Sequence, residues 1–502
     1  MEPEATTPHA KKRRTQVSER REQEEMASLS PHNQEPPPAT DAPRPVPTSH
    51  GQEPRHGAGA EGEDGADRIS CLPDAILGEI ISLLPTKDGA RTRTLASRWR
   101  HLWLAAPLNL DVSRIPAANQ DALAGVISRI LAAHPGPARR FSVPALHLHR
   151  RRATVAAWLR SPALDNLQEL EFDVGEIPNR RAPQLSLVTR PMQTLPASAF
   201  RFSSTLRVLT ISKCHLLDNL VETLNFPQLR LLGLEGVQIS DGSLHRIIAS
   251  CPVLECLLLS RSFGFRCPRI NSRSLRSIGM GTGELVIQDA PSLRRLIRLA
   301  PRRNSFHVSV VSAPKLETLG CLSDVGYTFN LALGTNVIER LHVISFKKEV
   351  CSVKILAVDI YQESLDAIMN LMRCFPCLEK VYIQMPTLTQ SQYWGHKQHD
   401  LTRCLDFHLK TVVLKNYQGI KSEANFATFF ILNAKMLEVM RFEGEACNDN
   451  KFVAKQHGLL QLEKRASRAA RFHFTTSRCS HYLARVKHVY DLAKADPFEC
   501  SC

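Results

Sequence analysis

Two pairs of potential metal ligands lie close together in the sequence. Cys374 and Cys377 form a Cys-x-x-Cys pair, and His396 and His399 form a His-x-x-His pair. Zinc sites use such pairs, but their two histidines are usually separated by about three to five residues. The Cys-Phe-Pro-Cys run also coincides with a recurring Pro-x-Leu motif, in which Cys251 precedes a proline in the same way. We therefore interpret these cysteines as packing residues and predict no metal site.

Other patterns that could carry catalysis are incomplete. The glycines Gly279, Gly281 and Gly283 suggest a phosphate-binding loop, but they match neither the dinucleotide-binding nor the P-loop spacing, and no Lys-Ser or Lys-Thr follows them. We interpret them as turn glycines. The chain has no Gly-x-Ser-x-Gly nucleophile elbow and no local cysteine signature of a known protease or ligase. The sequence thus predicts no catalytic residues and no cofactor, and favours a protein that binds other macromolecules.

A basic stretch near the end of the chain leaves a second class of function open. Residues 464–471 contain four cationic side chains and are followed by Phe472 and Phe474, a combination that can bind single-stranded nucleic acid. No fold signature of an RNA- or DNA-binding domain surrounds it, so we favour a solvated surface. The alternative hypothesis is a basic nuclear nucleic-acid-binding or scaffold protein.

Length and composition place the chain among folded, multidomain proteins. It has 502 residues, of which 43% are hydrophobic and 23% are charged, enough for a large buried core. No run approaches the roughly 18 apolar residues of a membrane-spanning helix, and the first thirty residues lack the apolar core of a secretory signal. The 14 cysteines are scattered, as expected for reduced thiols. We expect a protein of the nucleus, the cytoplasm or both.

The charge is distributed unevenly between the start of the chain and the rest. Residues 1–66 hold 8 Lys and Arg against 12 Asp and Glu, together with ten prolines, so the remaining chain carries a net charge of +19. Such a segment cannot bury enough apolar surface to fold, and we predict a disordered tail. Within it, the cluster Lys11, Lys12, Arg13 and Arg14 is typical of a nuclear-import signal.

Residues 67–111 have the pattern of a small helical unit. Pro73 and Asp74 suit the first turn of a helix, and apolar residues follow at helical spacing up to Pro85, which ends the helix. Two further short helices are expected before residue 111. Three short helices make only a small core, so the surplus of Leu, Ile and Trp implies that another protein buries part of this surface.

This unit closely resembles the F-box of plant proteins. The resemblance spans about 45 residues and rests on Leu72-Pro73-Asp74, Leu83-Leu84-Pro85-Thr86 and Arg98-Trp99-Arg100 with Leu102-Trp103. It implies a three-helix module that docks on a Skp1-like adaptor and through it joins a cullin-RING ubiquitin ligase. By resemblance, the candidate adaptor-facing or module-fixing residues are Leu72, Pro73, Leu77, Ile80, Leu84, Trp99 and Trp103.

The middle of the chain repeats. A Pro-x-Leu motif begins short apolar runs at Pro227, Pro252, Pro291, Pro314 and Pro376. Related runs, such as Ile338-Glu-Arg-Leu-His-Val, lack the proline. Most separations fall near the roughly 20 to 29 residues of a leucine-rich repeat. Each run predicts one short strand. We expect an irregular solenoid of parallel strands with helices on the convex side, including helices within residues 241–251 and 362–375, and intervening residues lining a concave face.

The fold class is therefore α/β, an N-terminal three-helix F-box followed by an irregular leucine-rich-repeat solenoid. Residues 401–445 resemble the FBD region that ends many plant F-box/leucine-rich-repeat proteins, with a helix expected at 426–437. The expected domains are the tail (1–66), the F-box (67–111), the repeats (112–400), the FBD-like cap (401–445) and a C-terminal extension (446–502). We expect the extension to form peripheral helix and strand, with loose final residues.

The resemblance implies a non-catalytic substrate receptor of a Skp1-cullin-F-box ubiquitin ligase. Its partners would be a Skp1-like adaptor, through it cullin and RING subunits, and a target protein held by the repeats. Residues 112–444 hold 40 Lys and Arg against 26 Asp and Glu, which predicts a target with an acidic surface. The identity of the target and its contact residues cannot be derived from the repeats alone.

Overall fold

A computed structural model of the 502-residue chain describes most of residues 69–499. Within these bounds it leaves out residues 70, 113–114, 116–118, 135–136, 174–191, 282, 300–304, 325–328, 362–364, 387–407, 477–482 and 485. The chain divides into two units, residues 1–66 and 67–502, and all described elements belong to the second. The predicted tail and its basic cluster at residues 11–14 lie outside the described residues.

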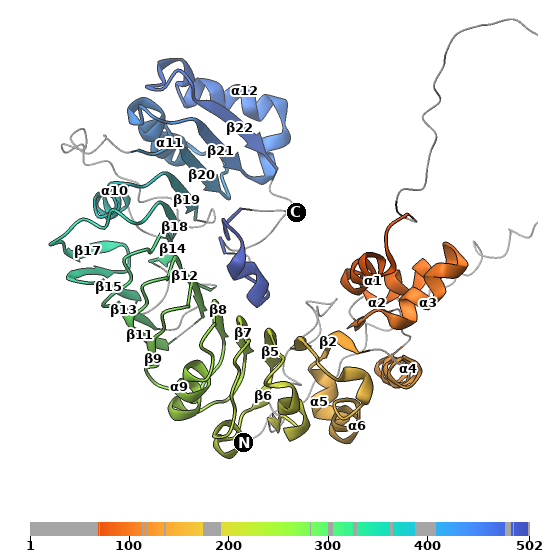
Figure 1. The fold of residues 1–502 in the computed structure, drawn as a ribbon. Helices are drawn as coiled ribbons and strands as arrows, with labels where there is room; N and C mark the ends of the chain where they lie inside the picture. Colours follow the sequence, from red (N-terminus) through yellow and green to blue (C-terminus); the bar gives the residue numbers. More distant parts are fainter. Residues whose placement is uncertain are drawn as a thin grey trace, which may run out of the picture. The chain divides into compact units, whose positions relative to one another are not determined.

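One long sheet runs through the second unit (Figure 1). Its 14 strands follow one another in sequence order, and every neighbouring pair is parallel, as the repeat pattern predicted. The strands are β1 (Leu108–Asp111), β2 (Ala138–Pro144), β3 (Glu169–Asp173), β5 (Val208–Ser212), β7 (Leu231–Glu235), β8 (Cys256–Ser260), β10 (Ser277–Met280), β12 (Arg295–Arg298), β14 (Thr318–Ser323), β18 (Ile355–Asp359), β19 (Lys380–Gln384), β20 (Thr411–Lys415), β21 (Val439–Glu443) and β22 (Arg471–Thr475).

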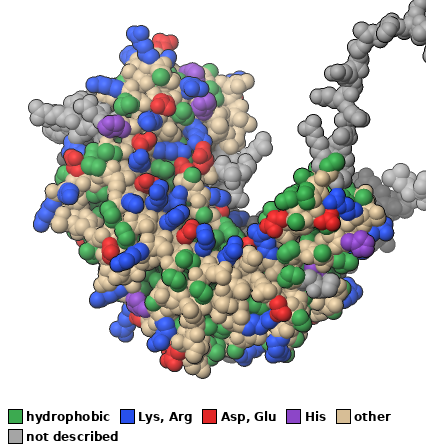
Figure 2. Space-filling view, in the orientation of Figure 1, with side chains coloured by type: hydrophobic (Ala, Val, Ile, Leu, Met, Phe, Trp, Pro, Cys, Tyr) green, Lys and Arg blue, Asp and Glu red, His purple; other side chains and the backbone are tan. Residues whose placement is uncertain are grey.

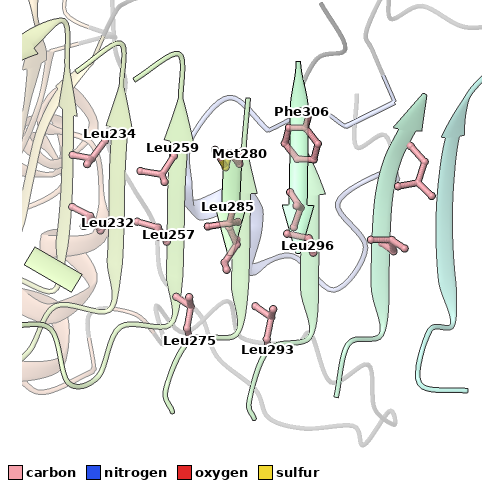
Figure 3. Close-up of a cluster of buried hydrophobic side chains, with 14 of the residues drawn as sticks. Leu232, Leu234, Leu257, Leu259, Leu275, Met280, Leu285, Leu293, Leu296 and Phe306 are labelled. Carbon is pink, nitrogen blue, oxygen red and sulfur yellow. The ribbon is translucent and has the colours of Figure 1, made fainter. Parts of the chain in front are cut away.

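A ladder of aliphatic side chains fixes the register of these strands. Leu209 pairs with Leu232, Leu232 with Leu257, Leu257 with Ile278, and Ile278 with Leu296, and all five side chains are buried. Figure 3 shows part of this ladder, with side chains from successive strands on the same face. Since side chains alternate between the two faces, a slip of one residue would move a whole strand's leucines to the other face. The ladder therefore allows only one register.

Helices cover the ladder at both ends of the sheet (Figure 1). In α9, Ser240 caps the first turn and Leu244, Ile247 and Ile248 point into the core, which confirms the helix predicted within 241–251. The helix expected at 426–437 begins earlier, at Lys421. The helices are α4 (Gln120–Ala133), α5 (Leu146–Arg150), α6 (Arg152–Trp158), α8 (Asp218–Val221), α9 (Asp241–Ala249), α10 (Leu365–Arg373), α11 (Lys421–Asn433) and α12 (Asn450–Leu459).

Between β8 and β18 the expectation of convex helices is wrong, because a second sheet covers the ladder there. Phe306, Val308 and Val310 are buried at every second position, the period of a strand rather than a helix. The run at Ile338, predicted as a strand of the main sheet, belongs to an antiparallel hairpin of this second sheet. Its order is β17 (His342–Ser345), β16 (Asn336–Glu339), β15 (Phe329–Leu333), β13 (Phe306–Val310), β11 (Gly283–Asp289) and β9 (Arg269–Asn271).

Three helices precede the sheet: α1 (Asp74–Leu83), α2 (Thr86–Arg91) and α3 (Ser97–Ala105). The first ends before Pro85, where Leu84 takes an extended backbone conformation, as the proline predicted. These helices have a small core of their own, separate from the ladder. That core consists of Leu77, Ile81, Trp99, Leu102 and Ala106, with Leu72 and Trp103 packed against it.

Leu257→Ala tests the ladder. Leu257 is fully buried between its neighbours on β7 and β10, so its truncation is expected to lower the free energy of unfolding by about 2–5 kcal/mol. A urea titration followed by circular dichroism measures the change. Val253→Ala is the control, because Val253 is 39% exposed and its loss should cost less than about 0.5 kcal/mol. Equal effects of the two substitutions would contradict the register of β8.

Candidate functional site

The seven residues predicted in or beside α1 to α3 differ in burial. Leu77 and Trp99 are buried in the helical core, and Leu72 and Trp103 pack against it. Leu84, just after α1, is half-buried, and Pro73 and Ile80 are exposed. The first four residues therefore hold the helices together, and Pro73 and Ile80 lie on the surface.

Two further apolar side chains, Ile76 and Leu83, are exposed near Ile80 on α1. Ile76, Ile80 and Leu83 recur at helical spacing on α1 and are all exposed, Ile76 by 50% and Leu83 by 56%. In Figure 2 hydrophobic side chains gather over these N-terminal helices. We call Ile76, Ile80 and Leu83 the α1 face. In the sequence, the surplus of apolar residues in this segment indicated that such an exposed apolar surface exists.

Polar contacts fix the helices to one another and to the sheet. Arg98 donates to the carboxylate of Asp74 and to the carbonyl of Leu72, which ties the start of α3 to the start of α1. The Thr86 hydroxyl donates to the carbonyl of Asn109 in β1, and the amide of Asp111 donates to that hydroxyl. The end of the segment predicted as an F-box is thus the first strand of the long sheet.

Gly89 in α2 lies directly against Trp103. A Cβ at this position would lie 3.3 Å from the indole nitrogen of Trp103. The ring of Trp103 in turn packs edge-on against His134, with the ring centroids 5.2 Å apart. The glycine therefore permits close packing of α2 on α3, although a helical glycine costs about 1 kcal/mol relative to alanine.

The other candidate surface is the face of the long sheet that points away from the helices and the second sheet, here called the inner face. In a leucine-rich-repeat solenoid this concave face was expected to bind the target. Instead, the described residues of 483–499, here called the C-terminal segment, pack against it (Figure 1, dark blue). The sheet residues in this contact are Val208, Cys256, Leu258, Ile297, Leu299, Cys321, Ala357, Tyr382 and Val413.

The C-terminal segment is held by apolar burial, which corrects the expectation that the whole extension is peripheral. The helix and strand expected in the extension are α12 and β22, and the final residues 500–502 lie outside the described residues. Val489 and Leu492, in the short 3₁₀ helix η9 (Val489–Ala493), are fully buried, and Phe498 is 1% exposed. Burial of each such side chain contributes about 1.5–3 kcal/mol. The expectation failed because its basis was local composition, whereas the burial comes from strands far away in the sequence.

Glycines within the strands let the segment approach the sheet closely. A Cβ at Gly279 in β10 would lie 2.9 Å from Leu492, and a Cβ at Gly320 in β14 would lie 2.9 Å from Phe498. At Gly233 in β7 it would lie 3.5 Å from Val489. Gly279 is therefore not the turn glycine that the sequence suggested. It lies within a strand, where the side chain of Leu492 packs against the backbone of the sheet.

The first half of the segment is also held by polar contacts. The Tyr490 hydroxyl donates to Glu169 at 2.7 Å, and His488 Nε2 lies 3.1 Å from the Glu171 carboxylate. Arg140 donates to the same carboxylate at 2.6 Å. Burial by itself raises the pKa of Glu171, but the hydrogen bond and charge of His488, with Arg140, hold its pKa below the usual value. Glu171 thus remains ionised where it meets the segment.

The second half contacts β19, β20 and β21. The Asp496 carboxylate accepts hydrogen bonds from Lys380 Nζ at 2.7 Å and from the Tyr382 hydroxyl at 2.9 Å. Lys415 donates to the carbonyl of Phe498 at 3.0 Å, and Arg441 donates to Glu499 at 2.9 Å. No sequence motif marked these cations as a group.

A further buried polar cluster lies at the ends of β12, β14 and β18. Arg298 is 3% exposed, and its guanidinium lies 5.3 Å and 5.2 Å from the ring centroids of Phe306 and Phe329. The Ser323 hydroxyl donates to Asp359 at 3.5 Å. Burial, together with the negative charge of Asp324, raises the pKa of Asp359 to about 7.

Only some of the residues first considered for chemistry lie in the described part of the chain. Cys374 is buried beside α10, and His396 and His399 lie outside the described residues. No group of three or more His, Cys, Asp or Glu that could hold a metal occurs in the described part of the chain. Phe474 stacks on Phe442 in the core, with ring centroids 4.7 Å apart, so it is not free to stack on a base. Among the described helices, none is long and apolar enough to cross a membrane.

The fold can now be compared with known proteins. Residues 155–383 match the model of the LRR repeats of FBD-associated F-box protein At5g56370, and residues 397–442 match the FBD model. The stacked strands and the first match define a leucine-rich-repeat protein. The second match nearly coincides with the FBD-like region predicted at 401–445.

Similar curated proteins come from Arabidopsis thaliana. Probable FBD-associated F-box protein At1g32375 is 23% identical over 416 residues, which cover 77% of this chain and 94% of that protein. FBD-associated F-box protein At5g56370 is 27% identical over 420 residues, covering 76% and 91%. F-box/FBD/LRR-repeat protein At5g56420 is 27% identical over 414 residues, covering 74% and 90%. The chain belongs to the family of FBD-associated F-box/LRR-repeat proteins.

Gly279→Val tests the seating of the C-terminal segment. The added side chain would collide with Leu492, so the segment is expected to detach and trypsin cleavage after Lys487 and Lys494 to accelerate by roughly tenfold. Cleavage is followed by mass spectrometry of limited digests. Gly242→Val is the matched control, because nothing lies within 4 Å of its Cβ position. Unchanged cleavage in Gly279→Val would show that the segment does not depend on this close approach.

Asp359→Asn tests the buried carboxyl group. With a folded-state pKa of about 7 against an unfolded value of 3.8, the native protein holds a proton that the unfolded chain has lost, so stability falls as the pH rises between these values. Asparagine does not ionise, so the variant does not lose stability in this way as the pH rises. Its advantage in unfolding free energy is expected to grow by roughly 2–3 kcal/mol from about pH 5 to about pH 8, measured by urea denaturation. A pH-independent difference would contradict the raised pKa.

Proposed function

We propose that this protein is the substrate-receptor subunit of a Skp1-cullin-F-box ubiquitin ligase, with no catalytic residues of its own. Residues 67–111 would be the F-box, which docks on a Skp1-like adaptor. The repeats would hold a target protein. Membership in the FBD-associated F-box/LRR-repeat family supports this assignment, and it is the observation on which the proposal depends.

The α1 face supplies the physical reason for an adaptor. Three aliphatic side chains at helical spacing are exposed on α1, although the helices already have a core of their own. An exposed apolar stripe of this kind is stabilised when a partner covers it. In this proposal Ile76, Ile80 and Leu83 with Pro73 contact the adaptor, while Leu77 and Trp99 keep the helices in place.

Proximity would then account for the reaction. A RING subunit recruits a ubiquitin-charged conjugating enzyme, and the receptor holds the target beside it. Tethering both reactants raises the effective concentration of the target lysine, so the receptor needs no nucleophile or general base.

A double substitution on the α1 face tests adaptor docking. Ile76→Asp/Ile80→Asp in the full chain is expected to weaken capture of a Skp1-like adaptor by at least about tenfold, because two charges would be buried against an apolar partner surface. A pull-down or calorimetric titration with the purified adaptor measures this. Both positions are exposed, so the fold should survive.

Two controls accompany this measurement. Val311→Asp changes an aliphatic side chain that is 65% exposed and lies outside α1 to α3, and it should leave adaptor capture unchanged. Deletion of residues 67–111 is a poorer variant, because it removes strand β1 and opens the edge of the long sheet. Full adaptor affinity in the double variant, or no adaptor binding by the folded wild-type chain, would overturn the proposal.

A further inference from the structure

Three cations from three neighbouring strands converge on four residues of the C-terminal segment. Lys380, Lys415 and Arg441 lie on β19, β20 and β21, and they contact residues 496–499. Their strands are paired in register, with Tyr382 opposite Val413 and Val413 opposite Arg441. We call Lys380, Tyr382, Lys415 and Arg441 the cationic patch.

The charges of this patch are matched by the C-terminal segment. Within the described residues, the ion pairs of Lys380 are made with Asp496 and Glu499, and that of Arg441 is made with Glu499. Lys415 donates to the Phe498 carbonyl. Without residues 496–499 the inner face would present three cations to solvent at this point. Such a surface attracts an acidic partner.

The patch also holds an aromatic ring between the two acidic residues. Phe498 is 1% exposed and packs on Tyr382, with ring centroids 5.5 Å apart. The ammonium groups of Lys380 and Lys415 lie 5.0 Å and 5.6 Å from the centroid of the Tyr382 ring. The patch thus recognises a short pattern, a carboxylate, an aromatic ring and a second carboxylate, in the order Asp-x-Phe-Glu.

The two halves of the C-terminal segment are anchored differently. The first half is buried through Val489 and Leu492, against glycines and apolar side chains. In the second half one apolar side chain, Phe498, is buried, and the other contacts are charged. The Lys380–Asp496 pair is largely buried, whereas the Glu499 side chain is 49% exposed. A partner segment that supplies its own carboxylates and aromatic ring can replace each of these contacts, so residues 496–499 can exchange with it while η9 stays in place.

We propose that the cationic patch is the docking surface for an acidic, aromatic peptide segment of the target protein, and that residues 496–499 occupy it in cis until such a segment displaces them. That the partner is a ligase target rests on the proposed function, whereas the chemistry of the docking surface does not. The net positive charge of the repeat region agrees with an acidic partner. The chain's own Asp496-Pro497-Phe498-Glu499 gives the chemistry of that partner.

A peptide-binding experiment with the full chain tests the proposal. The probe is a fluorescent peptide with the sequence of residues 492–499, Leu-Ala-Lys-Ala-Asp-Pro-Phe-Glu. The receptor is the variant Asp496→Asn/Phe498→Ala/Glu499→Gln, which loses the three anchors but keeps Val489 and Leu492. Fluorescence anisotropy is expected to show peptide binding at least about tenfold tighter than to the wild-type chain, in which the patch is occupied.

Specificity is tested on both partners. Adding Lys380→Ala and Arg441→Ala to the variant should weaken peptide binding by at least about tenfold. Replacing Phe498 by alanine in the peptide should weaken binding by a similar factor. Lys354→Ala is the matched control, because Lys354 pairs only with Glu379 among the described residues and makes no contact with the segment. Raising the salt from about 50 to about 300 mM should also weaken binding.

The wild-type chain provides a measurement that does not depend on the variant's fold. Excess peptide should accelerate hydrogen exchange at Phe498 and leave exchange at Val489 and Leu492 unchanged. No peptide binding by the folded variant, binding that ignores Lys380 and Arg441, or unchanged exchange in the wild type would each overturn the proposal and make residues 496–499 a permanent part of the fold. Loss of adaptor capture is a separate outcome, since the peptide assay involves neither the adaptor nor α1.

Discussion

The long sheet, and with it the second sheet and the seat of the C-terminal segment, depends on the aliphatic ladder. One repeat strand of four to seven residues cannot bury its own leucines, so each strand needs a neighbour with the same pattern at the same register. The ladder satisfies this requirement from β2 to β21, and the first and last strands lie beside helical elements. Because the pattern has a period of two, it also decides which side chains reach the opposite face, and so it determines the composition of the inner face.

The inner face is unusual because it is itself partly apolar. Val208, Leu258, Ile297, Tyr382 and Val413 point away from the ladder and would be exposed to water if nothing covered them. The C-terminal segment covers them. Its close approach is possible because glycines interrupt three of the strands. The inner face is thereby divided into an apolar part covered by η9 and a cationic part covered by residues 496–499, where Phe498 is buried between charged contacts.

The helices α1 to α3 present the opposite arrangement. Their core is complete without the α1 face, which remains exposed, and they are joined to the sheet through the Thr86 hydroxyl and the carbonyl of Asn109. An exposed aliphatic stripe and a cationic patch favour chemically different partners, one apolar and one acidic. Two surfaces with different chemistry are what the proposed function requires, since it assigns one to an adaptor and the other to a target.

The sequence by itself determined the elements whose signal is local. The Leu-x-x-Leu-x-Leu runs predicted parallel strands, Pro85 predicted the end of α1, and the pattern at 241–251 predicted α9. The FBD model matches residues 397–442, close to the FBD-like region predicted at 401–445. Three features were decided only by the tertiary structure. These are the second sheet over residues 269–345, the burial of the C-terminal segment, and the division of the seven candidate residues into core and surface. The physical reason is distance along the chain. Periodicity reports which face of an element is apolar, but contacts such as that between Thr210 and His488, 278 residues apart, decide what covers that face.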